Sequence, residues 1–472
     1  MSMKVNKWRF AISMLTMSLI GIWIMLSCPI NLDGHLEKAY WAIFGLHIVM
    51  QIMIVISVSR QEADLFEPII LVMLLYYCIF VYRPIIDIHN GDFMTFGVDP
   101  MSACPKSCVI VASSLISFWF AYYSGNKKQE PIEVSKRVLL GQSQILVKAY
   151  AVWIVAFAAS VLNLVISGKS LSYIFSLSLS GTIEDSADTG IAALSFFSYT
   201  MIAPWLYILI YDRGRTKKMI ITFLMLCVYV IRGTRITLLS MAAAVVLYFY
   251  LSRKRRPKFR SVIIAVIAML FVMSFLQAAR HGIRFGDSAS FSWEDFSTSM
   301  FTNVFDADLT TYKQFYAIVD AYPSKYPYTM GRAIIMQTLI TMIPRAIWPG
   351  KPDVVISEVI KNAVNQSAAD SGMASPNIGE YYFEFGVLGC VVLMFIVGKI
   401  FKHWKSYIAS NKTEKIIAYS CLYGVVFQLI IRTSTPSLVY QYIFTIVPIL
   451  LIERISIKQK KYEIEELTNG TH

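Results

Sequence analysis

The feature that most constrains this chain is a succession of long apolar segments. About 12 mainly apolar runs follow one another. Most have roughly 17–22 residues, close to the length that crosses the hydrocarbon core of a bilayer as a helix, and two are shorter. Hydrophobic residues make up 56% of the 472 residues and charged residues only 15%, which exceeds the apolar share of an ordinary soluble domain. The sequence therefore predicts an all-α polytopic membrane protein. The predicted spans are 9–28, 39–58, 66–82, 106–123, 145–166, 191–211, 219–231, 236–251, 261–279, 379–398, 414–431 and 436–453.

Basic residues predict which way the spans run. The first span follows Lys4, Lys7 and Arg9 and lacks a small-residue cleavage site, so it is expected to be retained with the amino terminus inside. Alternating sides from there places most Lys and Arg of the short loops on the cytoplasmic face. Membrane topology and anionic headgroups thus account for the net charge of +13, and no nucleic-acid partner is expected.

The same alternation predicts the division of the chain and places both termini in the cytoplasm. Residues 1–279 form a membrane domain with nine spans, 280–378 a large outer loop, 379–453 a membrane domain with three spans, and 454–472 a cytoplasmic tail.

Cysteine and histidine spacing gives little chemistry. Only Cys104 and Cys108 lie where an oxidant could reach them, and spacing alone does not decide whether they form a bridge. No His and Cys pattern has metal-ligand spacing, so neither a metal nor a cofactor is predicted.

Two arginines flank a glycine where two short spans meet. Arg232 and Arg235 belong to an Arg-Gly-Thr-Arg turn between 219–231 and 236–251. A 13-residue helix rises only about 20 Å against a core of about 30 Å, so these arginines would be recessed unless the helix recruits residues from the cytoplasmic loop. A recessed arginine costs about 2.5–3.5 kcal/mol, so it needs a water-filled cavity and usually an anionic partner. The alternative is an outer hairpin whose arginines extend to the interface.

The outer region 280–378 holds further cations and many aromatic residues. Arg280 and Arg284 are one helical turn apart with His281 beside them, and they could bind an anion or pair with nearby carboxylates. Arg345 lies in the proline-rich stretch 342–352, which is either a structural cap or a ligand contact. The aromatic residues suit sugar rings, and they equally suit a lid packed on the membrane domain.

Two carboxylates open the tenth span. Glu380 and Glu384 are spaced i and i+4 on one helical face, with Glu384 about 6 Å deeper. A carboxylate pair at a membrane mouth is costly unless it is hydrated or paired with arginine, which makes it a functional candidate. The other interpretation is a structural pair.

Several of these features coincide in one known family. The chain resembles the Wzy-type polymerases of bacterial O-antigen, capsule and enterobacterial common antigen, which join oligosaccharide repeat units. The resemblance rests on the span count, the large outer loop before the tenth span, and three motifs in order. They are Arg-Gly-Thr-Arg at 232–235, Ile-Pro-Arg-Ala-Ile-Trp-Pro-Gly-Lys-Pro at 343–352, and Ser-Pro-Asn-Ile-Gly-Glu followed by Phe-Gly-Val-Leu-Gly across 375–389.

The resemblance implies an enzyme, its substrate and its place in the cell. It implies a membrane glycosyltransferase with a lipid-donor (GT-C-like) architecture in the bacterial inner membrane, with its site facing the periplasm. The implied partners are an undecaprenyl-pyrophosphate-linked oligosaccharide, membrane lipid and a chain-length regulator protein.

That chemistry gives the candidate residues roles. A pyrophosphate leaving group must be neutralised, which bidentate arginines can do without a metal. A sugar hydroxyl must be oriented or deprotonated, for which Glu380, Glu384 or His281 could serve. The expected pyrophosphate-binding set is Arg232, Arg235, Arg280, Arg284 and Arg345.

Three other functions compete with a polymerase. O-antigen ligases carry a His-Asn type motif before Gly-x-x-Gly, whereas here Pro376 stands where the histidine would be, which argues against a ligase. A transporter or flippase shares the layout of about 12 spans, yet no repeat relates the two halves. A structural partner in an assembly complex has no reason to place arginines at the outer ends of its spans.

Overall fold

The computed structural model is a helical bundle. It describes residues 7–28, 34–59, 66–124, 142–166, 192–232, 235–252, 309–343, 347–352, 355–364, 374–408, 413–431 and 434–469. Within these ranges the only strand-like feature is one isolated bridge between Thr95 and Val98, so the all-α prediction is confirmed. The first helices are α1 (Lys7–Leu26), α2 (Gly34–Ser59), α3 (Pro68–Tyr77), π-helix η1 (Cys78–Tyr82), α4 (Arg83–Asn90), 3-10 helix η2 (Met101–Ala103), α5 (Cys104–Tyr123) and α6 (Gln142–Ile166). The middle of the chain forms α9 (Ala192–Thr200), α10 (Ile202–Tyr211), α11 (Arg215–Arg232), α12 (Arg235–Ser252) and α16 (Thr311–Ala321). The last are π-helix η3 (Arg332–Met336), α17 (Gln337–Thr341), α18 (Val355–Ala363), α19 (Asn377–Ile408), α20 (Thr413–Ile431) and α21 (Thr435–Asn469).

Eight of the described helical segments are long and apolar enough to cross a membrane, and each overlaps a predicted span. They are 34–57, 68–90, 101–123, 143–166, 194–211, 377–408, 413–431 and 435–453. Shorter apolar helices cover 14–26 and 237–252, and the predicted span 261–279 lies outside the described residues. The chain is therefore a multi-pass membrane protein.

The predicted length of the 219–231 span was wrong. Helix α11 begins at Arg215, so it has 18 residues and rises about 27 Å. It recruits the basic residues before the apolar run, because long basic side chains can extend from a helix end into the headgroup region. Helix α12 also has 18 residues, so length alone does not require recessed arginines.

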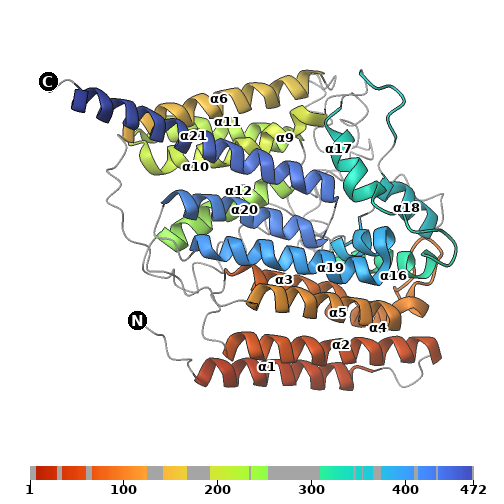
Figure 1. Cartoon of the computed structure of the whole chain (residues 1–472). Helices are drawn as coiled ribbons and strands as arrows, with labels where there is room; N and C mark the ends of the chain where they lie inside the picture. Colours follow the sequence, from red (N-terminus) through yellow and green to blue (C-terminus); the bar gives the residue numbers. More distant parts are fainter. Residues whose placement is uncertain are drawn as a thin grey trace, which may run out of the picture.

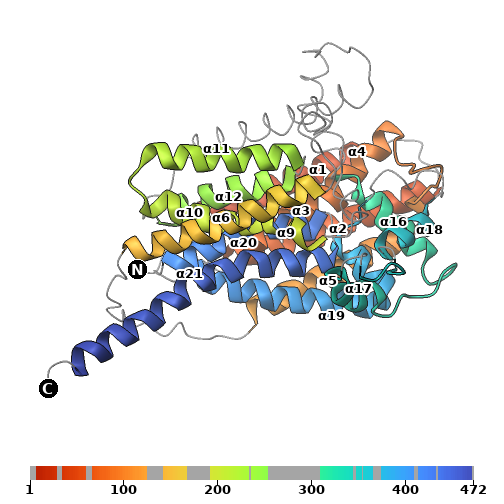
Figure 2. The ribbon, with the colours of Figure 1, turned by 90° about the horizontal axis from the view of Figure 1, so that it is seen from above.

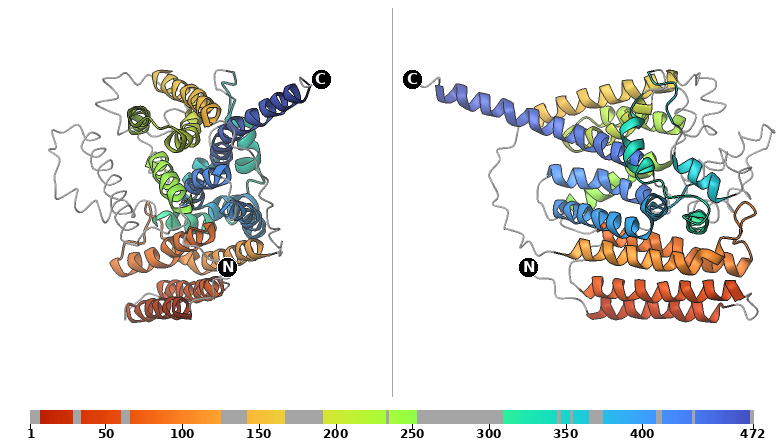
Figure 3. Two further views of the ribbon diagram at one scale, coloured as in Figure 1. Left: turned by 90° about the vertical axis from the view of Figure 1, so that its left-hand side faces the viewer. Right: turned by 45° about the vertical axis from the view of Figure 1, so that its right-hand side comes forward.

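The helices lie side by side, and one end of the bundle carries a helical cap. In Figure 1 the two outermost layers are α1 with α2 at the bottom and α6 at the top. Figures 1 and 2 both place α16, α17 and α18 together at one end, and α21 extends past the opposite end. The right-hand view of Figure 3 shows the same arrangement. We call these the cap end and the far end.

The buried apolar side chains form two clusters. One contains side chains of α1 to α5, α16, η3 and α18 to α21, and the other contains side chains of α6, α10 to α12, α20 and α21. Ile446 of α21 and Tyr407 of α19 pack against both clusters. Close helix contact needs small residues at the crossing points: a Cβ on Gly398 would meet the carbonyl of Phe118, and one on Gly424 would meet Ser240.

Helix α4 directly continues the third predicted span. It covers Arg83–Asn90, and the side chain of Asp87 within it is fully buried. Its carboxylate pairs with Arg83 at 2.8 Å and Lys313 at 3.4 Å, and accepts the Tyr312 hydroxyl at 2.6 Å. Burial raises the pKa of Tyr312, so this phenol keeps its proton and donates. These contacts fasten α16 of the cap to α4.

Candidate functional site

Helix α19 is interrupted at the cap end, directly after the second of the two predicted carboxylates. Phe385 and Gly386 leave helical geometry, and Gly386 adopts φ +65°. A side chain there would be strained, and its Cβ would lie 2.9 Å from the Tyr328 hydroxyl. The break leaves carbonyl groups without helical partners, and the backbone amides of Thr329 and Met330 bond to those of residues 383 and 384 at 2.9 and 3.1 Å.

Glu384 binds the segment that starts η3. Its Oε1 accepts hydrogen bonds from the Thr329 hydroxyl at 2.6 Å and from the Ala333 amide at 2.5 Å. Its other oxygen accepts the Gly331 amide. The first amides of a helix have no partner within the helix, and a carboxylate here satisfies two of them with charge-assisted bonds. Gly331 has φ +92°, which turns the chain so that both amides face the carboxylate.

Glu380, one turn earlier, binds a different helix. Its carboxylate accepts the Thr435 amide at 3.0 Å and the Thr435 hydroxyl at 2.5 Å. Thr435 is the first residue of α21, so Glu380 caps that helix in trans. We call Glu380 and Glu384 the carboxylate bracket, since together they hold η3 and α21 against α19.

The contacts of the carboxylate bracket position η3 and α21 relative to α19. Both carboxylates are buried, and each of their four oxygens accepts a hydrogen bond from the protein. Both were expected to lie on one face of α19, and both do lie in the first part of that helix, before the break. What the sequence does not reveal is their partners, which lie more than 50 residues away along the chain.

Asn377 opens α19 beside the bracket, and it too is fully buried. Its side-chain oxygen accepts the Tyr76 hydroxyl at 2.6 Å, which ties the start of α19 to α3. This asparagine belongs to the Pro-Asn motif named above. In this structure its polar atoms are engaged inside the membrane domain.

The ends of α11 and α12 that carry the predicted arginines lie at the cap end. Tyr207 of α10 donates to Glu453 of α21 at 2.8 Å, which places the end of α10 at the far end. Helix α11 starts a few residues later and runs back toward the cap, so it ends there at Arg232. Helix α12 starts at Arg235, and Ser240 packs on Gly424. The start of α12 therefore lies near the end of α20, next to the start of α21 that Glu380 caps.

The other predicted site residues fall outside the described ranges. These residues are Arg280, His281, Arg284 and Arg345. The side chains of Arg232 and Arg235 are likewise not described. Their predicted roles remain proposals.

One cation next to the carboxylate bracket was not among the predicted site residues. Arg332 directly follows Gly331 and is half exposed, and its guanidinium pairs with the exposed Glu358 of α18 at 3.0 Å. Exposed pairs of this kind contribute at most about 1 kcal/mol, so an anionic ligand could replace Glu358. The signal that could have found Arg332 is the Gly-Arg dipeptide, in which a glycine turn presents a cation.

The pair Cys104 and Cys108 is reduced. Their sulfur atoms are 3.8 Å apart on consecutive turns of α5, and both thiols are buried. The bridge that spacing left open is therefore absent from this structure. Among the described residues no group of three or more His, Cys, Asp or Glu side chains could hold a metal ion.

These features define an α-helical multi-pass membrane protein with a helical cap over one end of its bundle. The family model for O-antigen polysaccharide polymerase Wzy matches residues 9–460, nearly the whole chain. The chain therefore belongs to the Wzy polymerase family, whose members are glycosyltransferase-type enzymes that join lipid-linked O-antigen repeat units in membranes. The family expected from the sequence motifs is thus confirmed. Neither the curated proteins nor the solved structures contain a match.

Proposed function

We propose that this polymerase acts at the periplasmic face of the bacterial inner membrane, with the cap end outward and both termini in the cytoplasm. The stretch 212–218, which comprises the short turn after α10 and the first residues of α11, carries four basic residues and lies at the far end, as the positive-inside rule expects of a cytoplasmic connection. The extension of α21 beyond the far end supports the same orientation (Figure 1).

The proposed substrates are two undecaprenyl-pyrophosphate-linked oligosaccharides. A hydroxyl at the non-reducing end of the incoming repeat unit attacks the anomeric carbon of the growing chain. The bond from that carbon to the pyrophosphate oxygen breaks, undecaprenyl pyrophosphate leaves with the electron pair, and the hydroxyl proton passes to a base or to water. Arginines at the cap end neutralise the pyrophosphate, with Arg232, Arg235, Arg280, Arg284 and Arg345 as the proposed set.

The bracket contacts change the role that we propose for the two glutamates. Glu380 and Glu384 position the start of α21 and the turn that carries Arg332, so that the anion-binding rim keeps its shape. His281 remains the proposed acceptor-orienting group. The observation that carries this proposal is the engagement of both carboxylates by protein donors.

A deletion strain tests the proposed function. Loss of the O-antigen ladder with one repeat unit retained on the cell surface is the expected result. Complete loss of surface repeat units would point to a flippase or ligase instead. A chain-length regulator is a further proposed partner, which rests on the family alone, and co-purification from native membranes would test it.

A further inference from the structure

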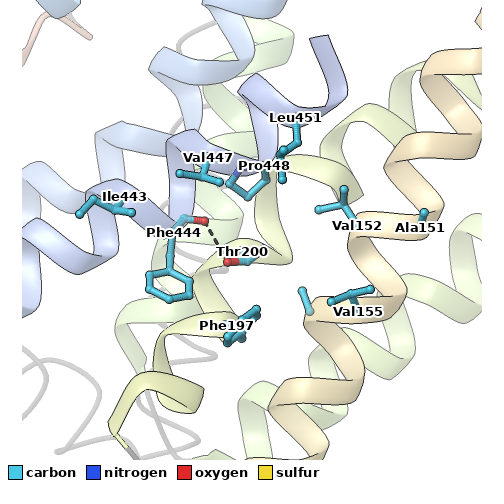
Figure 4. Close-up of a pocket in the computed structure, with 11 residues that line it drawn as sticks. Ala151, Val152, Val155, Phe197, Thr200, Ile443, Phe444, Val447, Pro448 and Leu451 are labelled. Atoms are coloured by element: carbon cyan, nitrogen blue, oxygen red, sulfur yellow. Dashed lines mark hydrogen bonds between the residues drawn. The ribbon is translucent and has the colours of Figure 1, made fainter. Parts of the chain in front are cut away.

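An apolar crevice of about 410 Å³ opens between α6, α9 and α21 (Figure 4). Small side chains on α6 form one wall, and larger apolar ones on α21 form the other. The lining residues are Ala151, Val152, Val155, Ala156, Phe197, Thr200, Ile443, Phe444, Val447, Pro448 and Leu451.

The one hydroxyl group in the lining, on Thr200, already donates a hydrogen bond to a backbone carbonyl of the lining. Pro448 has no amide hydrogen, so the carbonyl of Phe444 four residues earlier lacks its helical donor. The Thr200 hydroxyl donates to this carbonyl at 3.0 Å, as the dashed line in Figure 4 shows. A threonine on a neighbouring helix commonly repairs such a proline gap in membrane proteins. The lining therefore offers a ligand apolar contact and no spare donor.

The crevice opens toward lipid. Val155 on one rim is 63% exposed and Val447 on the other is 43% exposed, and both belong to candidate membrane spans. Apolar side chains exposed at this depth of a membrane protein face hydrocarbon chains. The crevice is therefore open to hydrocarbon chains that enter sideways from the bilayer.

The position of the crevice along the membrane normal determines which hydrocarbon chains are long enough to reach it from the cap end. Ile443 and Leu451 lie 8 and 16 residues after Thr435 in α21, which is about 12 and 24 Å along the helix axis. One leaflet supplies about 15 Å of hydrocarbon, half of the core. Seen from the cap end, most of the crevice lies beyond the bilayer midplane. A phospholipid whose headgroup lies at the cap end cannot fill it, whereas a much longer chain can.

We propose that this crevice binds the polyprenyl tail of the lipid-linked substrate. The inference rests on the proposed function for one point, the location of the pyrophosphate at the cap end. From there the tail runs along α21 past the midplane and packs against the small residues of α6. The enzyme thereby selects lipid carriers by length, and it holds the substrate by a part that takes no part in the chemistry.

The test combines substitutions that fill the crevice with substrates whose prenyl tails differ in length. In the double variant Val155→Phe with Val447→Phe, rings occupy the space from both rims. The matched control is Ile154→Phe with Leu450→Phe, which changes the neighbouring residues on the same two helices; both are exposed and neither lines the crevice. Purified proteins in phospholipid vesicles receive repeat units on undecaprenyl pyrophosphate or on geranyl pyrophosphate, whose tail is too short to reach Ile443.

We expect the filled variant to lose about tenfold in kcat/KM with the undecaprenyl substrate and to match the control with the geranyl substrate. Equal activity of filled variant and control with both substrates would overturn the inference and indicate bulk phospholipid in the crevice. An equal loss with both substrates would also overturn it.

A second readout does not depend on turnover. A photoreactive undecaprenyl pyrophosphate is expected to label peptides containing 151–156 and 443–451 in the wild-type protein and in the control, and not in the filled variant. Labelling without polymerisation would contradict the proposed function and leave the crevice assignment standing. Polymerisation without labelling of these peptides would support the proposed function and overturn the crevice assignment.

Discussion

Glu380 and Glu384 lie one helical turn apart on α19, yet they hold two separate segments of the chain, the start of α21 and the start of η3. Backbone amides at the start of a helix have no acceptor within the helix, and each carboxylate accepts hydrogen bonds from such amides. The cap-end parts of α19, η3 and α21 are thus joined by the side chains of these two glutamates. The geometry around the cap depends on this arrangement.

Replacing Glu384 with Gln tests whether this residue positions or catalyses. The amide group would present N–H hydrogens to backbone N–H donors, so we expect a loss of about 1–3 kcal/mol in unfolding free energy together with impaired polymerisation. Thermal unfolding in detergent and in vitro polymerisation measure the two effects. An inactive variant with unchanged stability would favour a direct catalytic role instead.

Gly386 gives a test of the break in α19. We expect Gly386→Ala to destabilise the protein by about 1–3 kcal/mol, because the residue has φ +65° and its Cβ would contact Tyr328. Gly45→Ala on α2 is the matched control, since nothing lies within 4 Å of the added Cβ. That control should be neutral or slightly stabilising. Similar melting temperatures for both variants would argue against the interruption of helix α19 at Gly386.

Much of this fold follows from the sequence, and the reason is physical. A chain in hydrocarbon must satisfy its backbone locally, so apolar runs predict α2, α5, α6 and α20 to within a few residues. The ends of the helices are harder to predict, because basic residues such as Arg215 can belong to a helix or to a loop. The bracket could be predicted only as two residues on one face. Its partners come from tertiary contacts that periodicity does not encode.

The repair of the proline gap can be measured by a double-mutant cycle. Thr200→Val removes the hydroxyl that serves the Phe444 carbonyl and should cost about 1 kcal/mol or more, and Thr200→Ser should restore most of it. In a Pro448→Ala background the helix regains its own donor, so Thr200→Val should cost less. Unfolding titrations of the four proteins give the coupling energy, and additive effects would rule out the repair.

Arg232 and Arg235 remain the sharpest test of pyrophosphate binding. Lysine keeps the charge and loses the planar two-point contact, so we expect both Arg→Lys variants to lose at least about tenfold in polymerisation rate. If the residues only anchor a helix end at the interface, lysine should serve equally well and activity should survive. Polymerisation by equally expressed variants separates these results.

Polymerisation by the purified wild-type protein tests the central claim most directly. The protein in phospholipid vesicles would receive only undecaprenyl-pyrophosphate-linked repeat units, and the products would be resolved by length while free undecaprenyl pyrophosphate is counted. We predict a ladder of products and one undecaprenyl pyrophosphate released for each linkage formed. A single unextended band, or transfer of the oligosaccharide only to a different acceptor, would contradict this account.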